Sequence, residues 1–228
     1  MGSRPVPRGA GLRLLHRASP NRGPRRDGAR PDLIVLHYTA MEDPGRALDW
    51  LCAPESQVSA HYLVDRSGGA VRLVPEAARA WHAGAGAWGG VRDVNSRSIG
   101  IEICNTGRMP FAAAQMDAVE ALVAGIMARW AIAPRRVIGH SDCAPGRKVD
   151  PGARFDWARL ARSGLAAATP RGEGAGDFAA LMVRAGYTAD ADPATLLSAL
   201  RLRHRPWARG PLDARDLGIA AGLAGQAD

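Results

Sequence analysis

Three short apolar runs constrain the fold of this chain more than any other feature. They occupy residues 33–39, 98–104 and 137–140, and their apolar side chains are almost all Ile, Val and Leu. Runs of this length and composition are typical of strands buried within a sheet. Stretches with helical periodicity separate them, above all residues 112–130. Strands that alternate with helices predict an α/β fold, in which helices flank a central mixed β-sheet.

Shorter signals complete this domain. Asp43 and Pro44 suit the cap and the first turn of a helix that reaches about residue 52. Residues 67–69 (SGG) lie between two apolar runs, a pattern that predicts a β-hairpin. A closing helix is expected over residues 155–164.

Composition divides the chain into four parts. Residues 1–20 are rich in Arg, Gly and Pro and predict a flexible basic tail. Residues 21–164 hold the elements described above, and residues 165–176 are typical of a linker. Residues 177–228 show helical periodicity with glycine breaks, which predicts a small C-terminal three-helix domain. A unit of about 50 residues buries little apolar surface, so we expect it to lean on the main domain.

The positive charge of the chain is concentrated at its N-terminus. The net charge is +8, and residues 1–30 hold eight arginines against one aspartate. The remaining chain is therefore nearly neutral. A basic tail can contact nucleic acid or anionic lipid, but this one contains no Phe, Tyr or Trp for base stacking and no known nucleic-acid-binding motif. We therefore expect a solvated leader and no nucleic-acid partner.

The same patterns indicate where the protein works. No apolar run approaches the roughly 20 residues that a membrane span requires. The longest apolar patch near the N-terminus is interrupted by Arg13, which is untypical of a secretory signal. Three widely spaced cysteines, Cys52, Cys104 and Cys143, argue against a disulfide framework. We expect a cytoplasmic protein; the alternative is a periplasmic one whose true start lies farther upstream.

Three residues with metal-ligating side chains lie at the ends of predicted elements. His37 ends one buried strand, His140 ends another, and Asp150 follows a Pro-Gly turn. A catalytic zinc site uses three protein ligands and leaves a position for water. Each histidine taken alone is more typical of a structural role. Together the three residues predict a Zn²⁺ site suited to amide hydrolysis.

Two charged residues accompany this set. Glu102 lies inside an apolar strand, where a carboxylate is costly unless it is paired or used. It is a candidate to orient or deprotonate a water, and the alternative is a core ion pair with an arginine. Lys148 is the only lysine among the 30 Lys and Arg residues. An ammonium differs from a guanidinium in shape and pKa, so Lys148 is a candidate to stabilise an oxyanion; the alternative is a chance surface residue.

Five segments carry a resemblance to a known family: residues 36–40 (LHYTA), 58–64 (VSAHYLV), 81–84 (WHAG), 98–102 (SIGIE) and 140–152 (HSDCAPGRKVDPG). Together they resemble the zinc-dependent N-acetylmuramoyl-L-alanine amidases of the AmpD/AmiD type, whose fold is shared with peptidoglycan recognition proteins. The resemblance covers about residues 18–164, and its last motif is highly specific.

The resemblance implies roles for individual residues. His37, His140 and Asp150 would bind zinc, and Glu102 and Lys148 would serve catalysis. The substrate would be the amide between the lactyl group of N-acetylmuramic acid and the L-alanine of a peptidoglycan stem peptide.

Substrate contacts and partners follow from the same resemblance. Arg147 would hold a stem-peptide carboxylate, and Trp81 and His82 would line the groove. The segment 177–228 is similar to the small helical peptidoglycan-binding-like domain that follows some of these amidases. We expect a monomer whose partners are muropeptides.

Three functions fit these observations. The first choice is an enzyme of cell-wall recycling that acts on anhydro-muropeptides, because no export signal is found. The second is an exported amidase that remodels intact peptidoglycan. The third is a non-catalytic peptidoglycan recognition module, but such relatives typically lack a metal ligand, whereas all three ligand candidates are present here.

Overall fold

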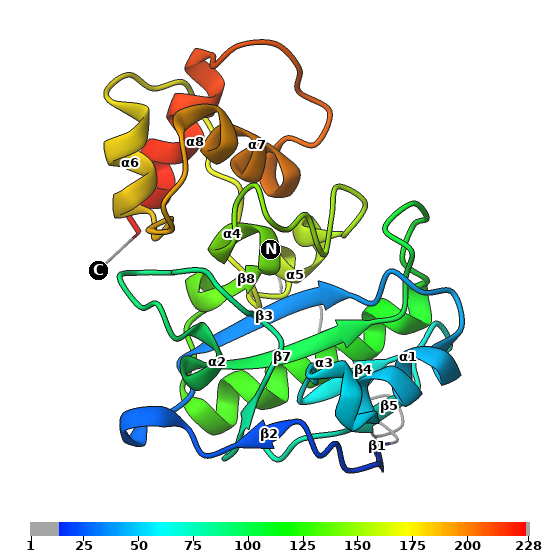
Figure 1. Ribbon diagram of the computed structural model, residues 1–228. Helices are drawn as coiled ribbons and strands as arrows, with labels where there is room; N and C mark the ends of the chain where they lie inside the picture. The colour runs from blue at the N-terminus through cyan, green and yellow to red at the C-terminus, as the bar shows by residue number, and fades with distance from the viewer. Residues whose placement is uncertain (1–13, 227–228) are drawn as a thin grey trace.

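The structure is a computed structural model that describes residues 14–226 of the 228-residue chain. Most of the expected N-terminal tail, residues 1–13, lies outside the described residues. Within the described part, six strands form one mixed sheet (Figure 1). Their order across the sheet is β1 (Leu14–His16), β5 (Ala70–Arg72), β4 (Tyr62–Val64), β7 (Ser98–Ile103), β3 (Leu33–Tyr38) and β8 (Val137–Gly139).

The central strands of this sheet are parallel. β4, β7, β3 and β8 run in one direction, while β5 pairs antiparallel with β4 as the predicted hairpin, and β1 is parallel to β5. A separate antiparallel ribbon joins β2 (Arg22–Gly23) and β6 (Arg79–Ala80). The prediction of a mixed sheet flanked by helices is therefore confirmed.

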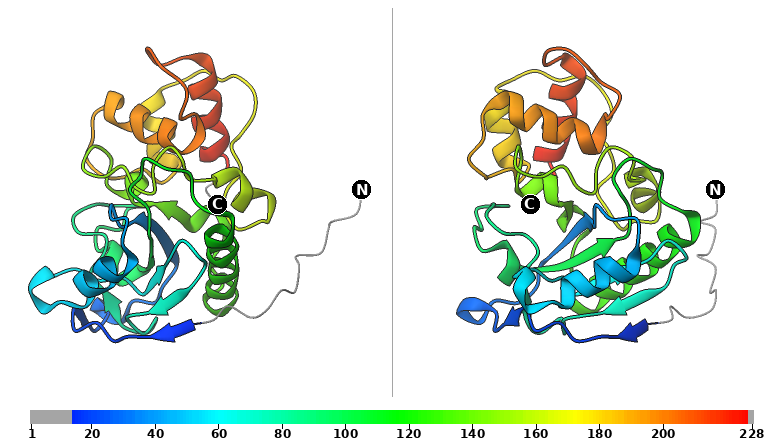
Figure 2. Two further views of the ribbon diagram at one scale, coloured as in Figure 1. Left: turned by 90° about the vertical axis from the view of Figure 1, so that its right-hand side faces the viewer. Right: turned by 45° about the vertical axis from the view of Figure 1, so that its right-hand side comes forward.

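Helices cover both faces of the sheet, as Figure 2 shows from the side. The long helix α3 (Ala113–Trp130) and the short α5 (Trp157–Arg162) share one core with Ile34, Leu36 and Ile101 of the sheet. On the other face α1 (Pro44–Cys52) packs through Ala47 and Leu51. Two single-turn helices, α2 (Val94–Arg97) and α4 (His140–Cys143), precede β7 and follow β8.

The C-terminal residues form the predicted small helical domain. It consists of α6 (Phe178–Arg184), α7 (Pro193–His204) and α8 (Ala214–Ala224), which lie together at one end of the molecule (Figure 1). An aspartate side chain caps the N-terminus of each helix. Their buried side chains join one core with Leu33, Val35 and Ile138 of the sheet. The unit therefore leans on the main domain, as its small size predicts.

The prediction of a flexible tail over residues 1–20 is wrong for its described part. Leu14–His16 forms β1 at the edge of the sheet, and the N–H of Ser19 donates to the carbonyl oxygen of Leu73 over 2.9 Å. Ser19 is buried, and its hydroxyl donates to the carbonyl oxygen of Leu51 over 2.6 Å. Backbone pairing with a neighbouring strand, which composition does not report, orders this segment.

Over residues 14–226, every helix is too short or too polar to span a bilayer.

Candidate active site

The two central strands place an imidazole and a carboxylate side by side. His37 of β3 and Glu102 of β7 are paired in the parallel register of these strands. Their neighbours Leu36 and Ile101 belong to the core under α3. Because successive side chains of a strand point to opposite faces, His37 and Glu102 both point away from α3.

β8 and the loop that follows supply the other two groups. β8 ends at Gly139, and α4 begins directly at His140. The side chain of Asp142 accepts a 2.8 Å hydrogen bond from the N–H of Gly139, which fixes the start of this short helix. The loop then returns, and the carbonyl oxygen of Asp150 accepts the N–H of Ser141 over 2.9 Å. This turn brings the Asp150 carboxylate to the His140 ring.

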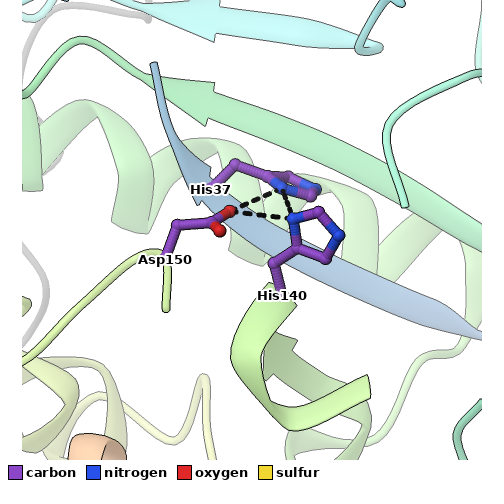
Figure 3. A group of neighbouring side chains, drawn as sticks. All are labelled: His37, His140 and Asp150. Atoms are coloured by element: carbon purple, nitrogen blue, oxygen red, sulfur yellow. Dashed lines mark hydrogen bonds and ion pairs between the residues drawn. The ribbon is translucent and has the colours of Figure 1, made fainter. Parts of the chain in front are cut away.

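Three ligating atoms converge where these elements meet (Figure 3). Nδ1 of His37 lies 2.9 Å from Nδ1 of His140 and 2.9 Å from Oδ2 of Asp150. Nδ1 of His140 lies 3.0 Å from the same carboxylate oxygen. All three residues are buried. The structure thus brings together the three residues that the sequence predicts as metal ligands.

Hydrogen bonds behind the two rings show that this group fits a cation. Nε2 of His140 lies 2.9 Å from the carbonyl oxygen of Ala83, which can only accept, so this nitrogen carries the ring proton. Nδ1 of His140 then presents a lone pair towards Asp150. Nε2 of His37 is also within hydrogen-bond distance of a neighbour, 3.0 Å from Nδ1 of His82. Two imidazole nitrogens and a carboxylate oxygen are a donor set that zinc and similar divalent ions accept.

Burial and neighbouring charges keep these groups in the forms that bind metals. Burial, together with the nearby His140, lowers the pKa of His37 to about 4. Burial alone would raise the pKa of Asp150, but the imidazoles of His140 and His37 beside its carboxylate outweigh burial and hold this pKa well below its usual range. At neutral pH His37 is therefore neutral and Asp150 is ionised, as metal binding requires.

Glu102 and Lys148 line the groove of about 380 Å³ that contains the three ligating side chains. Burial, and then the charge of Asp150, raise the pKa of Glu102 to about 8, against the opposing charge of Lys148. Its Oε2 atom is buried and has no hydrogen-bond partner among the described residues. A carboxylate kept in such surroundings can exchange a proton near neutral pH, which suits a general base or acid.

The predicted substrate contacts lie in the same groove. Trp81, His82 and Arg147 all line it. One guanidinium nitrogen of Arg147 donates to the carbonyl oxygens of Ala83, over 2.5 Å, and of Ala85. That Trp81, His82 and Arg147 contact substrate stays a prediction. The side chains of His82 and Arg147 already bond to groups of the protein itself.

Some residues of the site are missed by sequence reasoning. The side chain of Asn95 accepts hydrogen bonds from the N–H groups of both His82 and Ala83. Trp50 of α1 lines the groove and is 49% exposed. The role of Asn95 has no signal in the sequence, because the motif at residues 81–84 does not reveal that the backbone of His82 and Ala83 needs a hydrogen-bond acceptor.

Comparison with known proteins decides the family. Residues 27–153 match the Amidase_2 family model, described as N-acetylmuramoyl-L-alanine amidase. The chain belongs to this family. The matched residues include His37, His140 and Asp150, together with Glu102 and Lys148.

Individual amidases extend the match. N-acetylmuramoyl-L-alanine amidase AmiD of Escherichia coli is 43% identical over 154 residues, which are 60% of this chain and 55% of AmiD. The chain thus spans about half the length of that curated relative. The 1,6-anhydro-N-acetylmuramyl-L-alanine amidase AmpD of Escherichia coli is 34% identical over 159 residues, which are 62% of this chain and 87% of AmpD.

The likeness to one solved amidase structure extends beyond the amidase domain into the C-terminal helices of this chain. That structure is Escherichia coli AmiD in complex with the substrate anhydro-N-acetylmuramic acid-L-Ala-D-γ-Glu-L-Lys. The two chains superpose with a TM-score of 0.77 at 33% identity, covering 92% of this chain and 93% of the other. Since residues 27–153 are little more than half of the chain, this coverage includes helices beyond the amidase domain. The predicted family and fold are therefore confirmed.

Proposed function

We propose that this chain is a zinc hydrolase that cleaves the amide between the lactyl group of N-acetylmuramic acid and the L-alanine of a stem peptide. Its substrates would be anhydro-muropeptides released during cell-wall recycling. The observation that carries the proposal is the convergence of His37, His140 and Asp150 in a groove, within the segment that matches the amidase family. The anhydro substrate of AmiD and the name of AmpD support the choice of anhydro-muropeptides.

His37, His140 and Asp150 would hold the zinc ion. A zinc ion bound there would polarise the scissile carbonyl and lower the pKa of a bound water. The protein supplies neutral imidazole and ionised carboxylate at neutral pH, because of the pKa shifts of His37 and Asp150. The site thus needs no large rearrangement of charge before the metal binds.

Glu102 would accept the proton of the attacking water and pass it to the leaving amine of L-alanine. Burial of its carboxyl group, and then the charge of Asp150, raise its pKa to about 8, which lets the same carboxyl group take and return a proton. Lys148 lines the groove on which the substrate lies and would stabilise the negative charge that develops on the carbonyl oxygen. Of the two protons of the attacking water, one reaches the leaving nitrogen through Glu102 and the other leaves the new carboxylic acid for solvent, so the products are the free amine of L-alanine and a carboxylate on the lactyl group.

The groove walls would hold the rest of the substrate. Trp50 and Trp81 offer apolar surface to the sugar ring and to the methyl groups beside the scissile bond. Arg147 keeps guanidinium nitrogens beyond the one bonded to Ala83, and these can meet a stem-peptide carboxylate. We propose that the enzyme acts as a monomer in the cytoplasm, where recycled muropeptides are soluble.

The test is hydrolysis by the purified protein of soluble anhydro-muropeptide and of intact peptidoglycan sacculi. Each substrate is assayed with and without a chelator, with zinc added back, and with Asp150→Ala as the inactive control. Cleavage confined to the soluble fragment, lost on chelation and restored by zinc, supports the proposal. Cleavage of sacculi would instead assign wall remodelling outside the cytoplasm. Binding without cleavage of either substrate would leave only a recognition module.

A further inference from the structure

Two consecutive residues, His82 and Ala83, contact the Nε2 atoms of the candidate ligands His37 and His140, on the side of each ring away from the ligating Nδ1. Nδ1 of His82 lies 3.0 Å from Nε2 of His37, and the carbonyl oxygen of Ala83 lies 2.9 Å from Nε2 of His140. One dipeptide therefore contacts the far nitrogen of each ring. Such contacts fix which nitrogen carries the proton and how the ring is oriented.

The hydrogen bonds that run from His37 through His82 and Ser98 are all satisfied by one assignment of donors and acceptors. If Nδ1 of His37 faces the metal, its proton is on Nε2, which donates to Nδ1 of His82. His82 then carries its own proton on Nε2, which lies 3.1 Å from Oγ of Ser98. The Ser98 hydroxyl donates in turn to the carbonyl oxygen of Val94 over 2.6 Å. Every donor in this series meets an acceptor, so a single proton arrangement satisfies all four residues.

The position of the dipeptide is set by Asn95. Its Oδ1 atom accepts the N–H of His82 over 3.0 Å and the N–H of Ala83 over 2.8 Å. Asn95 is 7% exposed and lies in α2, whose first turn is capped by Asp93. The two hydrogen bonds therefore tie the dipeptide to a fixed element of the main domain.

The ring of His82 also has little room to move. It lies against the backbone of Gly100 in β7, where an added Cβ would be 2.4 Å from the ring. On its other side it contacts the ring of His37 edge-on, with 5.0 Å between the ring centroids. A shift of the dipeptide would therefore reach the ligand ring directly.

We propose that Asn95 is a positioning residue of the metal site. By holding the backbone of His82 and Ala83, it orients both ligand histidines and fixes their Nε2–H tautomers. The side chain of Asn95 bonds the backbone N–H groups of His82 and Ala83 and does not itself line the groove, so we expect its effect to be on metal affinity. The inference rests on the proposed function only in requiring that His37 and His140 bind a metal.

The test compares two buried amides that differ in where they lie. Gln115 of α3 is fully buried and bonds two backbone carbonyls, those of Val64 and Cys104, on the face of the sheet that carries α3. Gln115→Ala is therefore the matched control for Asn95→Ala. Asn95→Asp keeps an oxygen that can accept both N–H groups. Each purified variant, stripped of metal, is titrated with Zn²⁺ in competition with a chromophoric chelator, and its unfolding by urea is measured without metal.

We expect Asn95→Ala to lose about 10- to 100-fold in zinc affinity, Asn95→Asp to stay close to the wild type, and Gln115→Ala to lose stability but not zinc affinity. In ¹⁵N spectra of the zinc-loaded wild type, the rings of His37, His82 and His140 should all carry their proton on Nε2. Equal zinc affinities of the wild type and Asn95→Ala, or equal losses in Asn95→Ala and Gln115→Ala, would overturn the inference.

Two further outcomes are kept separate. If Asn95→Ala does not fold, Asn95→Ser, whose shorter side chain cannot reach both N–H groups, takes its place, with the same expected loss. If the wild type itself binds no zinc, the proposed function fails, and that result is distinct from a wild type that binds zinc as tightly as its Asn95 variants.

Discussion

The hydroxyl of Tyr187, in the C-terminal helical domain, donates a 2.7 Å hydrogen bond to the buried carboxylate of Asp142. Asp142 also accepts a 2.8 Å bond from Arg203 of α7 and the N–H of Gly139. Because Asp142 lies two residues after His140, the small domain is bonded to the turn that presents a candidate metal ligand. The small domain therefore supports this turn of the main domain.

This contact predicts how substitutions in the small domain act. Tyr187→Phe keeps the ring but leaves one oxygen of Asp142 without its donor, so we expect a loss of about 1–3 kcal/mol in the free energy of unfolding. Arg203→Met leaves a buried carboxylate without its cation and should cost more, about 3–5 kcal/mol. Urea unfolding of the metal-free protein measures both. A Tyr187→Phe protein as stable as the wild type would contradict the prediction.

The elements predicted best are those whose signal is local. The periodicity of residues 112–130 and the apolar run at residues 33–39 specify α3 and β3 because burial of a face or of a whole strand is visible in each segment alone. β1 is missed because its residues look like the basic tail. Arg25 shows the same limit: it donates to the carbonyl oxygens of Glu76, Ser96 and others, far along the chain, and no local pattern reports such contacts.

The candidate site divides in the same way. Residue types and strand ends suffice to select His37, His140 and Asp150, because a metal needs specific side chains. Part of the support behind them is missed because backbone groups make it: the N–H of His82 and the carbonyl oxygen of Ala83 have no sequence signal. Which acidic side chain forms an ion pair with which basic one also depends on the tertiary fold, as the pair of Asp142 and Arg203 illustrates.

Loss of the Glu102 carboxylate should abolish most of the activity without loss of the metal. Glu102→Gln keeps the shape of the side chain but cannot exchange a proton, so we expect kcat to fall by about 10²- to 10⁴-fold. Zinc affinity should stay close to that of the wild type, because Glu102 is not among the three converging ligands. Steady-state hydrolysis and a zinc titration of the same sample measure the two effects. A variant that retains a tenth of the wild-type kcat would exclude Glu102 as the proton acceptor.

The only lysine offers a clean comparison of two cations. Lys148→Ala removes the charge that would stabilise the oxyanion, and we expect a fall in kcat of about 10²- to 10³-fold. Lys148→Arg keeps the charge but replaces a compact ammonium by a planar fork, so activity should be restored only in part. Arg108→Lys, in the loop after β7, is the control for exchanging these cations away from the groove. Full activity of Lys148→Ala would leave Lys148 as an ordinary surface residue.

Zinc should stabilise the folded protein through the three converging ligands. A ligand that binds only the folded state at 100 times its Kd adds about 2.7 kcal/mol to the free energy of unfolding. We expect this increment in the wild type, reversed by a chelator, and not in Asp150→Ala. Urea unfolding at matched zinc concentrations measures it. An equal increment in Asp150→Ala would show that zinc binds elsewhere on the chain.

Glu76 should make stability depend on pH through its contacts with α3. Its carboxylate accepts hydrogen bonds from Tyr62, over 2.6 Å, from Arg129, over 2.6 Å, and from Trp130, over 2.6 Å. Burial opposes ionisation, but these three donors outweigh it and lower the pKa of Glu76 below its ordinary value. The unfolded chain therefore takes up the proton first as the pH falls.

The sign of the effect follows. The stabilisation by Glu76 is fully present above the ordinary pKa of about 4.3 and is lost as the pH falls through the lowered pKa of the folded state. We expect the difference in unfolding free energy between the wild type and Glu76→Gln to shrink as the pH falls from about 6 to about 3. Urea unfolding across this range measures it, with the exposed Glu55→Gln as control. A difference that stays constant with pH would mean that the hydrogen bonds to Glu76 do not depend on its charge.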